Sequence, residues 1–257
     1  MKNCLIGYTG FIGKNILRQK KFTNFYNTKN INQISAHKFN LALICAPHAK
    51  KWWANKYPKK DSIIVDNLIQ NLRSLKTKKV IFISTIDIYE TKENLNEKSK
   101  IKISRFNVYG KNRLKIEKFI INNFKDYHII RLPALFGKHL KKNILYDLIY
   151  NNNLDQIILN SSYQWYDIED LYSDIKIILN KRIKLINLFP EPITTNELVD
   201  KFFPQKKNFL NKKKLGPSYN LKSLYYEIFS KKNGYIREKK QILNKLKVFI
   251  KNEIINI

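Results

Sequence analysis

The chain has 257 residues, of which 44% are hydrophobic and 27% are charged, and its formal net charge is +29. This length and composition exclude a disordered chain and favour one domain with an appendage, or two small domains. No apolar run approaches the ~20 residues of a membrane span, and the N-terminus lacks the pattern of a signal peptide. Cys4 and Cys45 lie in apolar runs without metal-ligand spacing, which predicts buried thiols in a reducing compartment. We therefore expect a cytoplasmic protein that binds no metal.

A positive charge of this size ordinarily indicates a nucleic-acid partner. Here the lysines are scattered along the whole chain and accompany an excess of Ile and Asn, the composition that an AT-rich genome produces. We favour compositional drift over a dedicated polyanion surface and expect no specific nucleic-acid partner. A polyanion-binding module stays as an alternative, and the charge also suits an anionic small substrate such as a nucleotide.

The first half of the chain alternates short apolar runs with helical patterns, which is typical of a parallel sheet covered by helices. Strands are expected over 3–7, 22–27, 39–46, 78–85 and 126–137, and helices over 11–19, 61–75 and 110–124. Beyond this point the pattern loosens. It predicts a helix over 144–150, a strand over 156–160, a helix over 170–179, a strand over 184–190 and a last helix over 236–250.

The stretch "GYTGFIG" directly follows the first expected strand. In this context Gly7 permits a tight turn, Gly10 lets the backbone approach a pyrophosphate, and Gly13 allows close helix packing. A helix that begins at Phe11 directs its free N–H groups at the phosphates. A plain tight turn is the alternative, but the position between a strand and a helix favours a dinucleotide site. Its expected contacts also include Thr9 and Ile12.

An acidic residue about 20 positions after such a turn normally binds the adenosine ribose of NAD. The first acidic residue of this chain is Asp61, and the end of the second expected strand carries Asn27, Thr28 and Lys29 instead. A cation at this place suits the 2′-phosphate of NADP, so we expect NADP to be preferred over NAD. The alternative, that Lys29 is one more surface lysine, has about equal weight.

Two further stretches carry groups suited to catalysis. In "ISTIDIYE" the hydroxyls of Ser84 and Thr85 stand at the carboxyl end of a strand, where open α/β sheets bind their ligands. In "VYGKNRLKIEKF", Tyr109 opens a helix and Arg113 lies on the same face one turn later. The neighbouring Lys111 is rotated away from Tyr109, as is Lys115, so neither replaces Arg113.

These stretches together resemble the extended short-chain dehydrogenase/reductase family, which comprises sugar-nucleotide epimerases, reductases and dehydratases. The resemblance runs from Met1 to about Leu198 and includes "GYTGFIG", "ICA", "STIDIY", "YGKNRLKIEKF", "RLPALFG" and "YDIEDL" in the family's order. It implies a Rossmann-type doubly wound parallel sheet over 1–185. It also implies a small C-terminal substrate-binding lobe over 186–257, joined by part of 138–165.

The resemblance also implies roles for three residues. In that family a Tyr, and a Lys four residues later, sit beside a Ser or Thr at the nicotinamide; the Lys binds the ribose and lowers the pKa of the Tyr. Carried over, Thr85 orients the substrate oxygen, Tyr109 is the acid/base and Arg113 replaces the Lys. A guanidinium favours a tyrosinate but cannot relay a proton. This departure keeps a non-catalytic NADP-binding protein of the same fold as an alternative.

A second departure concerns the reaction. Dehydratases of this family carry an Asp-Glu pair after the catalytic Thr, where this chain has Ile86 and Asp87, so dehydration is disfavoured. Reduction or epimerisation of a nucleotide-activated sugar by hydride transfer fits, an activity that usually serves the assembly of surface polysaccharide. A homodimer is compatible with this reading. The remaining implied contacts are Cys45 and Ala46 with the cofactor, and Ser84, Thr85, Lys142, Asn143, Gln164 and Tyr166 with the substrate.

Overall fold

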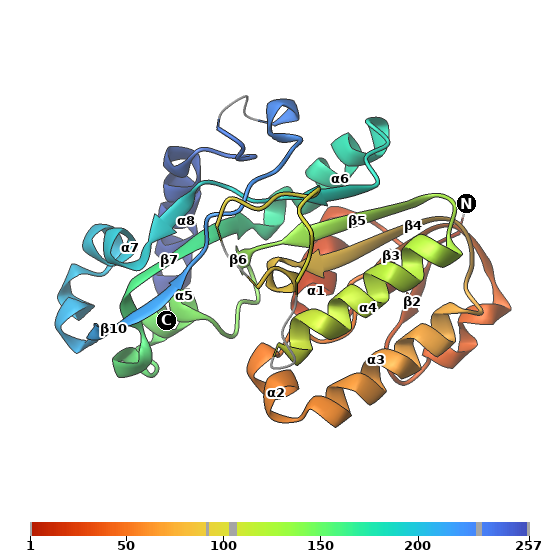
Figure 1. Cartoon of the computed structure of the whole chain (residues 1–257), viewed down its shortest axis with the longest axis horizontal. Coiled ribbons are helices and arrows are strands. Elements are labelled where there is room, and N and C mark those ends of the chain that lie inside the picture. Colours follow the sequence, from red (N-terminus) through yellow and green to blue (C-terminus); the bar gives the residue numbers. More distant parts are fainter. Residues whose placement is uncertain (1, 91–92, 103–106, 230–232, 256–257) are drawn as a thin grey trace. The chain divides into compact units, whose positions relative to one another are not determined.

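The computed structural model describes residues 2–90, 93–102, 107–229 and 233–255 (Figure 1). The chain divides into two compact units that each consist of several segments. The first unit comprises Met1–Glu90, Lys100–Leu132 and Glu169–Ile186, and the second comprises Thr91–Ser99, Pro133–Ile168 and Asn187–Ile257. The second unit therefore includes all of Pro133–Ile168, where the sequence assigns only part of 138–165 to the lobe.

The first unit is built on a six-stranded sheet of order β2-β1-β3-β4-β5-β8. Neighbouring strands from β2 to β5 are parallel. Helices α3 and α4 cover one face of this sheet, and α1 and α6 cover the other (Figure 1). This arrangement confirms the predicted Rossmann-type fold. Its strands are β1 (Asn3–Ile6), β2 (Asn24–Tyr26), β3 (Lys38–Ile44), β4 (Lys76–Thr85), β5 (Tyr127–Leu132) and β8 (Leu185–Asn187). Its helices are α1 (Phe11–Gln19), α2 (Lys51–Lys56), α3 (Pro58–Leu72), α4 (Val108–Asn123) and α6 (Leu171–Asn180).

The order of the strands places the ends of β1 and β3 side by side. The chain leaves β1 towards β2 and then returns to the opposite side of β1 to form β3. Such a reversal of direction is where open α/β sheets bind ligands, at the carboxyl ends of the strands. The buried centre of the sheet is apolar, as in Ile44, Val80 and Phe82, because helices cover both faces.

Proline accounts for the main difference from the predicted elements. The expected strand over 126–137 is divided at Pro133 into β5 and β6 (Ala134–Phe136), which belong to different sheets. Proline has no N–H to donate to the ladder, so pairing with β4 ends before it. Helix α2 was not predicted, and the expected strand over 156–160 becomes the longer β7 (Ile158–Asp167).

The second unit is organised around β7. This strand pairs in parallel with β6 and with β10 (Asn211–Ser218), and antiparallel with β9 (Pro192–Thr194). Its helices are α5 (Ile144–Tyr150), α7 (Thr195–Phe202) and α8 (Lys239–Ile255). Helix α8 buries Ile242, Leu246 and Ile250 and packs against α5 and β7. Short 3-10 helices occur at Ile31–Ala36, Ile86–Ile88, Leu154–Gln156, Ile168–Asp170, Pro204–Phe209 and Tyr226–Ile228. Among the described residues, no helix is both long enough and apolar enough to cross a membrane.

Candidate active site

The glycine turn leaves space for a ligand at only one of its three glycines. Gly7 has a φ of +84°, and a Cβ built on it would lie 2.6 Å from the carbonyl oxygen of Cys45. A Cβ on Gly13 would lie 2.3 Å from the carbonyl oxygen of Gly7. At Gly10 the nearest atom would be 3.4 Å away. Gly7 and Gly13 are therefore required by packing against protein, whereas Gly10 faces open space, as a pyrophosphate-binding position requires.

Helix α1 presents its first turn to the same space. Gly10 is its N-cap, it provides no side-chain cap, and the first turn contains no acidic residue. The N–H groups of a first helical turn have no partner within the helix, and together with the helix dipole they attract anions. Gly7 also contacts the end of β3, so the turn lies beside Cys45 and Ala46. Burial raises the pKa of both the Cys4 and the Cys45 thiol, as expected for buried thiols, although Cys45 as a whole residue is partly exposed.

The residues expected to bind the adenosine ribose lie just beyond the carboxyl end of β2. Asn27 donates from Nδ2 to the hydroxyl of Tyr8, which belongs to the glycine turn, over 3.1 Å. Its Oδ1 accepts from the backbone N–H of Lys29 over 2.8 Å. The Lys29 side chain is exposed. The structure thus places Asn27 and Lys29 next to the turn, and the preference for NADP stays a prediction.

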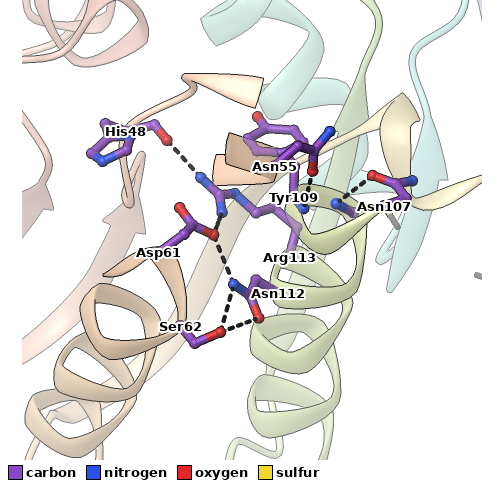
Figure 2. Close-up of polar contacts among 9 residues, drawn as sticks. His48, Asn55, Asp61, Ser62, Asn107, Tyr109, Asn112 and Arg113 are labelled. Atoms are coloured by element: carbon purple, nitrogen blue, oxygen red, sulfur yellow. Dashed lines mark hydrogen bonds and ion pairs between the residues drawn. The ribbon is translucent and has the colours of Figure 1, made fainter. Parts of the chain in front are cut away.

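Tyr109 is fixed at the start of α4 by three asparagine contacts, of which Figure 2 shows two. Asn107 is the N-cap: its Oδ1 accepts from the Gly110 N–H over 3.0 Å, and its Nδ2 donates to the carbonyl of Asp87 over 2.8 Å. The Tyr109 N–H donates to Oδ1 of Asn55 on α2 over 3.1 Å. Helix α2 therefore holds the first turn of α4 against the sheet.

The Tyr109 hydroxyl is close enough to the side chain of Thr85 for this side chain to lower the pKa of Tyr109, so the structure brings two of the three predicted catalytic groups together. The Tyr109 side chain is buried, and this burial raises its pKa above the ordinary value. Arg113 lowers the same pKa, Asp87 raises it, and Thr85 and Lys51 lower it, but burial outweighs them. The phenol is therefore neutral at physiological pH and able to donate a proton.

Arg113 lies under the ring of Tyr109, with Cζ 4.1 Å from the ring centroid. Both ends of its guanidinium are occupied (Figure 2). Nη1 donates to Oδ2 of Asp61 over 2.9 Å, and Nη2 donates to the backbone carbonyl of His48 over 2.5 Å. The Arg113 side chain is 4% exposed and the Asp61 side chain is 0% exposed. The expected position beside Tyr109 is thus observed, but the guanidinium is directed into the protein.

Asp61, on α3, is a site residue that sequence reasoning missed. Its Oδ2 also accepts from Nδ2 of Asn112 over 2.7 Å, and Asn112 contacts Ser62 (Figure 2). The other carboxylate oxygen, Oδ1, is buried without a hydrogen-bond partner. The sequence shows only that Asp61 is the first acid of the chain and stands at the start of a helix. That position favours an acid for reasons of the helix dipole alone.

Ser84, which was expected to contact substrate, belongs to a buried network, and its contact with substrate stays a prediction. Its hydroxyl donates to Oε1 of Glu117 over 2.5 Å, and Glu117 is paired through Oε2 with Arg131 over 2.7 Å. Arg131 in turn donates to the hydroxyl of Tyr89 over 2.6 Å. These four side chains are all buried. Thr85 is therefore the better placed of the two neighbouring hydroxyls to meet a ligand.

The other four expected substrate residues lie in the second unit. Lys142 is exposed, and Tyr166 is buried. Asn143 caps α5, accepting from the backbone N–H groups of Leu145 and Tyr146. Gln164 is buried; its Nε2 donates to the carbonyls of Pro190 and Leu221, and its Oε1 accepts from the Leu221 N–H. The polar atoms of Asn143 and Gln164 thus stabilise the backbone of this unit, and their contact with substrate stays a prediction.

A glycine turn at the reversal of strand order, with a tyrosine and a threonine in the same unit, defines a Rossmann-type nucleotide-binding protein. The model of the NAD dependent epimerase/dehydratase family matches residues 24–185, and the chain belongs to this family. This result confirms the resemblance found in the sequence. The matched region starts after the glycine turn. No curated protein sequence matches the chain.

Solved structures match the chain over almost its whole length. A dTDP-4-dehydrorhamnose reductase from Clostridium acetobutylicum has 17% identity and a TM-score of 0.74, with 98% of this chain and 100% of that chain covered. The same enzyme from Bacillus anthracis, in complex with NADP, has 16% identity and a TM-score of 0.66, with both chains covered to 100%. A UDP-glucuronic acid 4-epimerase from Bacillus cereus, in complex with a UDP-sugar and NAD, has 14% identity and a TM-score of 0.74, with 98% and 99% covered. At these identities the likeness shows a shared fold.

Proposed function

We propose that the protein is an NAD(P)-dependent reductase or epimerase that acts on a nucleotide-activated sugar, with Tyr109 as the acid/base. The observation that carries this proposal is the proximity of Tyr109 to Thr85 at the carboxyl end of β4, with Arg113 beneath the Tyr109 ring. These residues lie in the same unit as a glycine turn that is open at Gly10. The reductase and the epimerase of similar fold, which bind NADP in one case and NAD with a UDP-sugar in the other, support the substrate class.

The residues of this chain divide the chemistry between them. The open backbone at Gly10 and the first turn of α1 would hold the pyrophosphate of a nicotinamide dinucleotide, which supplies or accepts a hydride when bound. Thr85 orients the substrate oxygen, and Tyr109 gives its proton to that oxygen on reduction or takes it on oxidation. Ile86 provides no acid beside Thr85, so elimination of water is not part of the proposal.

The candidate substrate contacts of the second unit are proposed on the family resemblance. Lys142 has an exposed side chain and would meet the diphosphate of a nucleotide sugar through its charge. The other three candidates would support substrate binding indirectly, by maintaining the shape of the second unit: Asn143, Gln164 and Tyr166. The amides of Asn143 and Gln164 bind backbone groups. An Ala substitution of Lys142 should raise the KM for the sugar nucleotide and leave dinucleotide affinity unchanged.

A non-catalytic NADP-binding protein of the same fold is the second candidate. The observation that favours it is the engagement of both Nη atoms of Arg113 with protein groups, Asp61 and the His48 carbonyl, in place of a ribose. The raised pKa of Tyr109 points the same way, because it disfavours the tyrosinate that oxidation of a sugar hydroxyl would need.

Two measurements test the proposal. Nucleotide released from the purified protein is identified by mass spectrometry, and calorimetry measures the affinity for NAD and NADP. Wild-type protein should bind at least one of them, and Gly10→Val should abolish binding by filling the open position. A wild type that binds neither dinucleotide would contradict both candidates.

Turnover separates the two candidates. A panel of UDP- and dTDP-linked sugars and 4-keto sugars is followed by the absorbance of reduced nicotinamide and by chromatography of the sugar. Tyr109→Phe should lower turnover by about 10²-fold or more and leave dinucleotide affinity nearly unchanged. Equal turnover by the wild type and Tyr109→Phe would exclude Tyr109 as the acid/base.

A further inference from the structure

Helix α2 presents two polar side chains to the start of α4. Lys51 and Asn55 are four residues apart and so lie on the same face of this short helix. Asn55 accepts the hydrogen bond of the Tyr109 N–H, as Figure 2 shows. Lys51 is paired through Nζ with Oδ1 of Asp87 over 2.6 Å. The same contact that fixes Tyr109 therefore also brings a lysine to this part of the site.

Asp87 links this lysine to the catalytic pair. Its backbone N–H donates to Oγ1 of Thr85 over 3.2 Å, and its carbonyl accepts from Asn107, the cap of α4. The Asp87 side chain is 15% exposed, so its charge is poorly screened by water. Its negative charge raises the pKa of Tyr109, and the positive charge of Lys51 lowers it. Lys51 therefore lies within electrostatic reach of the Tyr109 hydroxyl and opposes Asp87.

Within the described part of the chain, the two cations that lower the pKa of Tyr109 differ in their exposure to solvent. The Arg113 side chain is 4% exposed, and both ends of its guanidinium are bonded inside the protein. The Lys51 side chain is 44% exposed and forms an ion pair with Asp87. A guanidinium keeps its proton, whereas an ammonium exchanges protons with water. Of these two cations, Lys51 is the one that is exposed.

We propose that Lys51 is a positioning residue of the active site whose ammonium, held by Asp87, balances the negative charge that develops on Tyr109 during proton transfer. This inference rests on the proposed function. In the reduction, the Tyr109 O–H bond breaks as the substrate oxygen gains the proton, and the phenolate regains a proton from water. Lys51 on α2 adds its positive charge to that of Arg113, which also lowers the pKa of Tyr109 and packs against its ring.

The test measures the ionisation of Tyr109 without cofactor or substrate. Ultraviolet absorbance is titrated against pH for each protein and for the same protein carrying Tyr109→Phe, and the difference isolates this one tyrosine. Lys51→Met should raise the pKa of Tyr109 by about 0.5–1 unit, because an attractive charge is lost. Lys51→Arg should restore it, and Asp87→Asn should shift it downward. Among the described residues, the charged groups that act on Tyr109 are Lys51 on α2, Asp87 after β4 and Arg113 on α4, with Asp61 on α3 behind Arg113.

Lys111→Met is the matched control, since Lys111 is an exposed lysine on the first turn of α4. It should leave the titration unchanged. With a sugar substrate, Lys51→Met should also move the pH profile of kcat in the same upward direction, and Lys51→Arg should return it. A Lys51→Met protein with unaltered Tyr109 ionisation would overturn the inference, as would an upward shift for Asp87→Asn. If Lys51→Met does not fold, two other variants test the inference. Asp87→Asn should lower the pKa of Tyr109, and Lys51→Arg should leave it at the wild-type value. Failure of the wild type to bind a dinucleotide would contradict the proposed function and leave this titration valid.

Discussion

The glycine turn and the surroundings of Tyr109 lie in the same unit and are built in opposite ways. At the turn, the geometry depends on the absence of a Cβ in glycine. Gly7 and Gly13 allow backbone segments to approach closely, and Gly10 leaves space for a ligand. Around Tyr109 the geometry depends on charges that are matched, with Arg113 bonded to Asp61 and Lys51 bonded to Asp87. The first kind of site is specified by spacing along the chain. The second is specified by partners that are far apart in sequence.

The difference has a consequence for substitution. Removing one member of a matched pair leaves the other charge without its partner, and a buried charge without a partner is costly. Adding a Cβ to a glycine destabilises the fold by an amount that depends on how far the neighbouring atoms must move. The two regions therefore respond to different changes, and their responses can be measured on the same protein.

The largest effect is expected at the buried pair. Arg113→Met leaves the Asp61 carboxylate, which is 0% exposed, without its cation. We expect a loss of about 3–5 kcal/mol in the free energy of unfolding, measured by urea denaturation. Adding Asp61→Asn to Arg113→Met should recover part of that loss, because it removes the unpaired charge as well.

Lys115→Met on the same helix is the control for this prediction. Lys115 is paired with Asp66, and both side chains are about half exposed at 52% and 54%. An exposed pair contributes about 0–1 kcal/mol, so this change should be nearly neutral. If the Arg113 variant were as stable as the Lys115 variant, the buried pair would not support the fold, and the comparison drawn above would fail.

The sequence predicted the turn well and the matched charges poorly, for a physical reason. Helix α1 has the bounds expected for it, Phe11–Gln19. The strands of the first unit were predicted because they are buried and therefore appear in the sequence as apolar runs. The position of Arg113 beside Tyr109 also followed from helical spacing. What Arg113 binds did not follow, because Asp61 is 52 residues away and nothing local distinguishes it from a helix-start acid.

Helix α2 shows the same limit. The six residues Lys51–Lys56 have no apolar stripe long enough to predict a helix, yet they carry Asn55 and Lys51 to the active site. Likewise, the sequence did not show that the Gln164 amide is bonded to the backbone of Leu221. The choice of partner for an amide depends on which backbone groups the fold leaves unpaired.

A smaller effect separates the two roles of glycine within the turn. Gly13→Ala would put a Cβ 2.3 Å from a backbone carbonyl oxygen, so the turn must move, and we expect a loss of about 1–3 kcal/mol in the free energy of unfolding. Gly10→Ala meets nothing closer than 3.4 Å and should leave stability nearly unchanged. Calorimetry should nevertheless show weaker dinucleotide binding for Gly10→Ala. Equal stability of the two variants would mean that the turn yields at Gly13, contrary to the packing described.

The smallest effect is expected at Lys29, an exposed charge that we predict to favour NADP over NAD. No acidic side chain precedes Asp61 in the sequence, so the segment that follows β2 carries no carboxylate to bind a free 2′-hydroxyl. Asn27 fixes the backbone of Lys29 by accepting from its N–H over 2.8 Å, which leaves the ammonium on a flexible and hydrated side chain.

An exposed ion pair of this kind contributes about 0.2–1 kcal/mol, so Lys29→Ala should weaken the binding of NADP by about 1.4- to fivefold and that of NAD by less. Lys21→Ala, an exposed lysine before β2, should change neither affinity and controls for net charge. Because the contact is exposed, the difference between wild type and Lys29→Ala should shrink as salt is added. Equal weakening of NAD and NADP would instead make Lys29 a general contributor to the positive surface. The predicted preference for NADP would then not depend on Lys29.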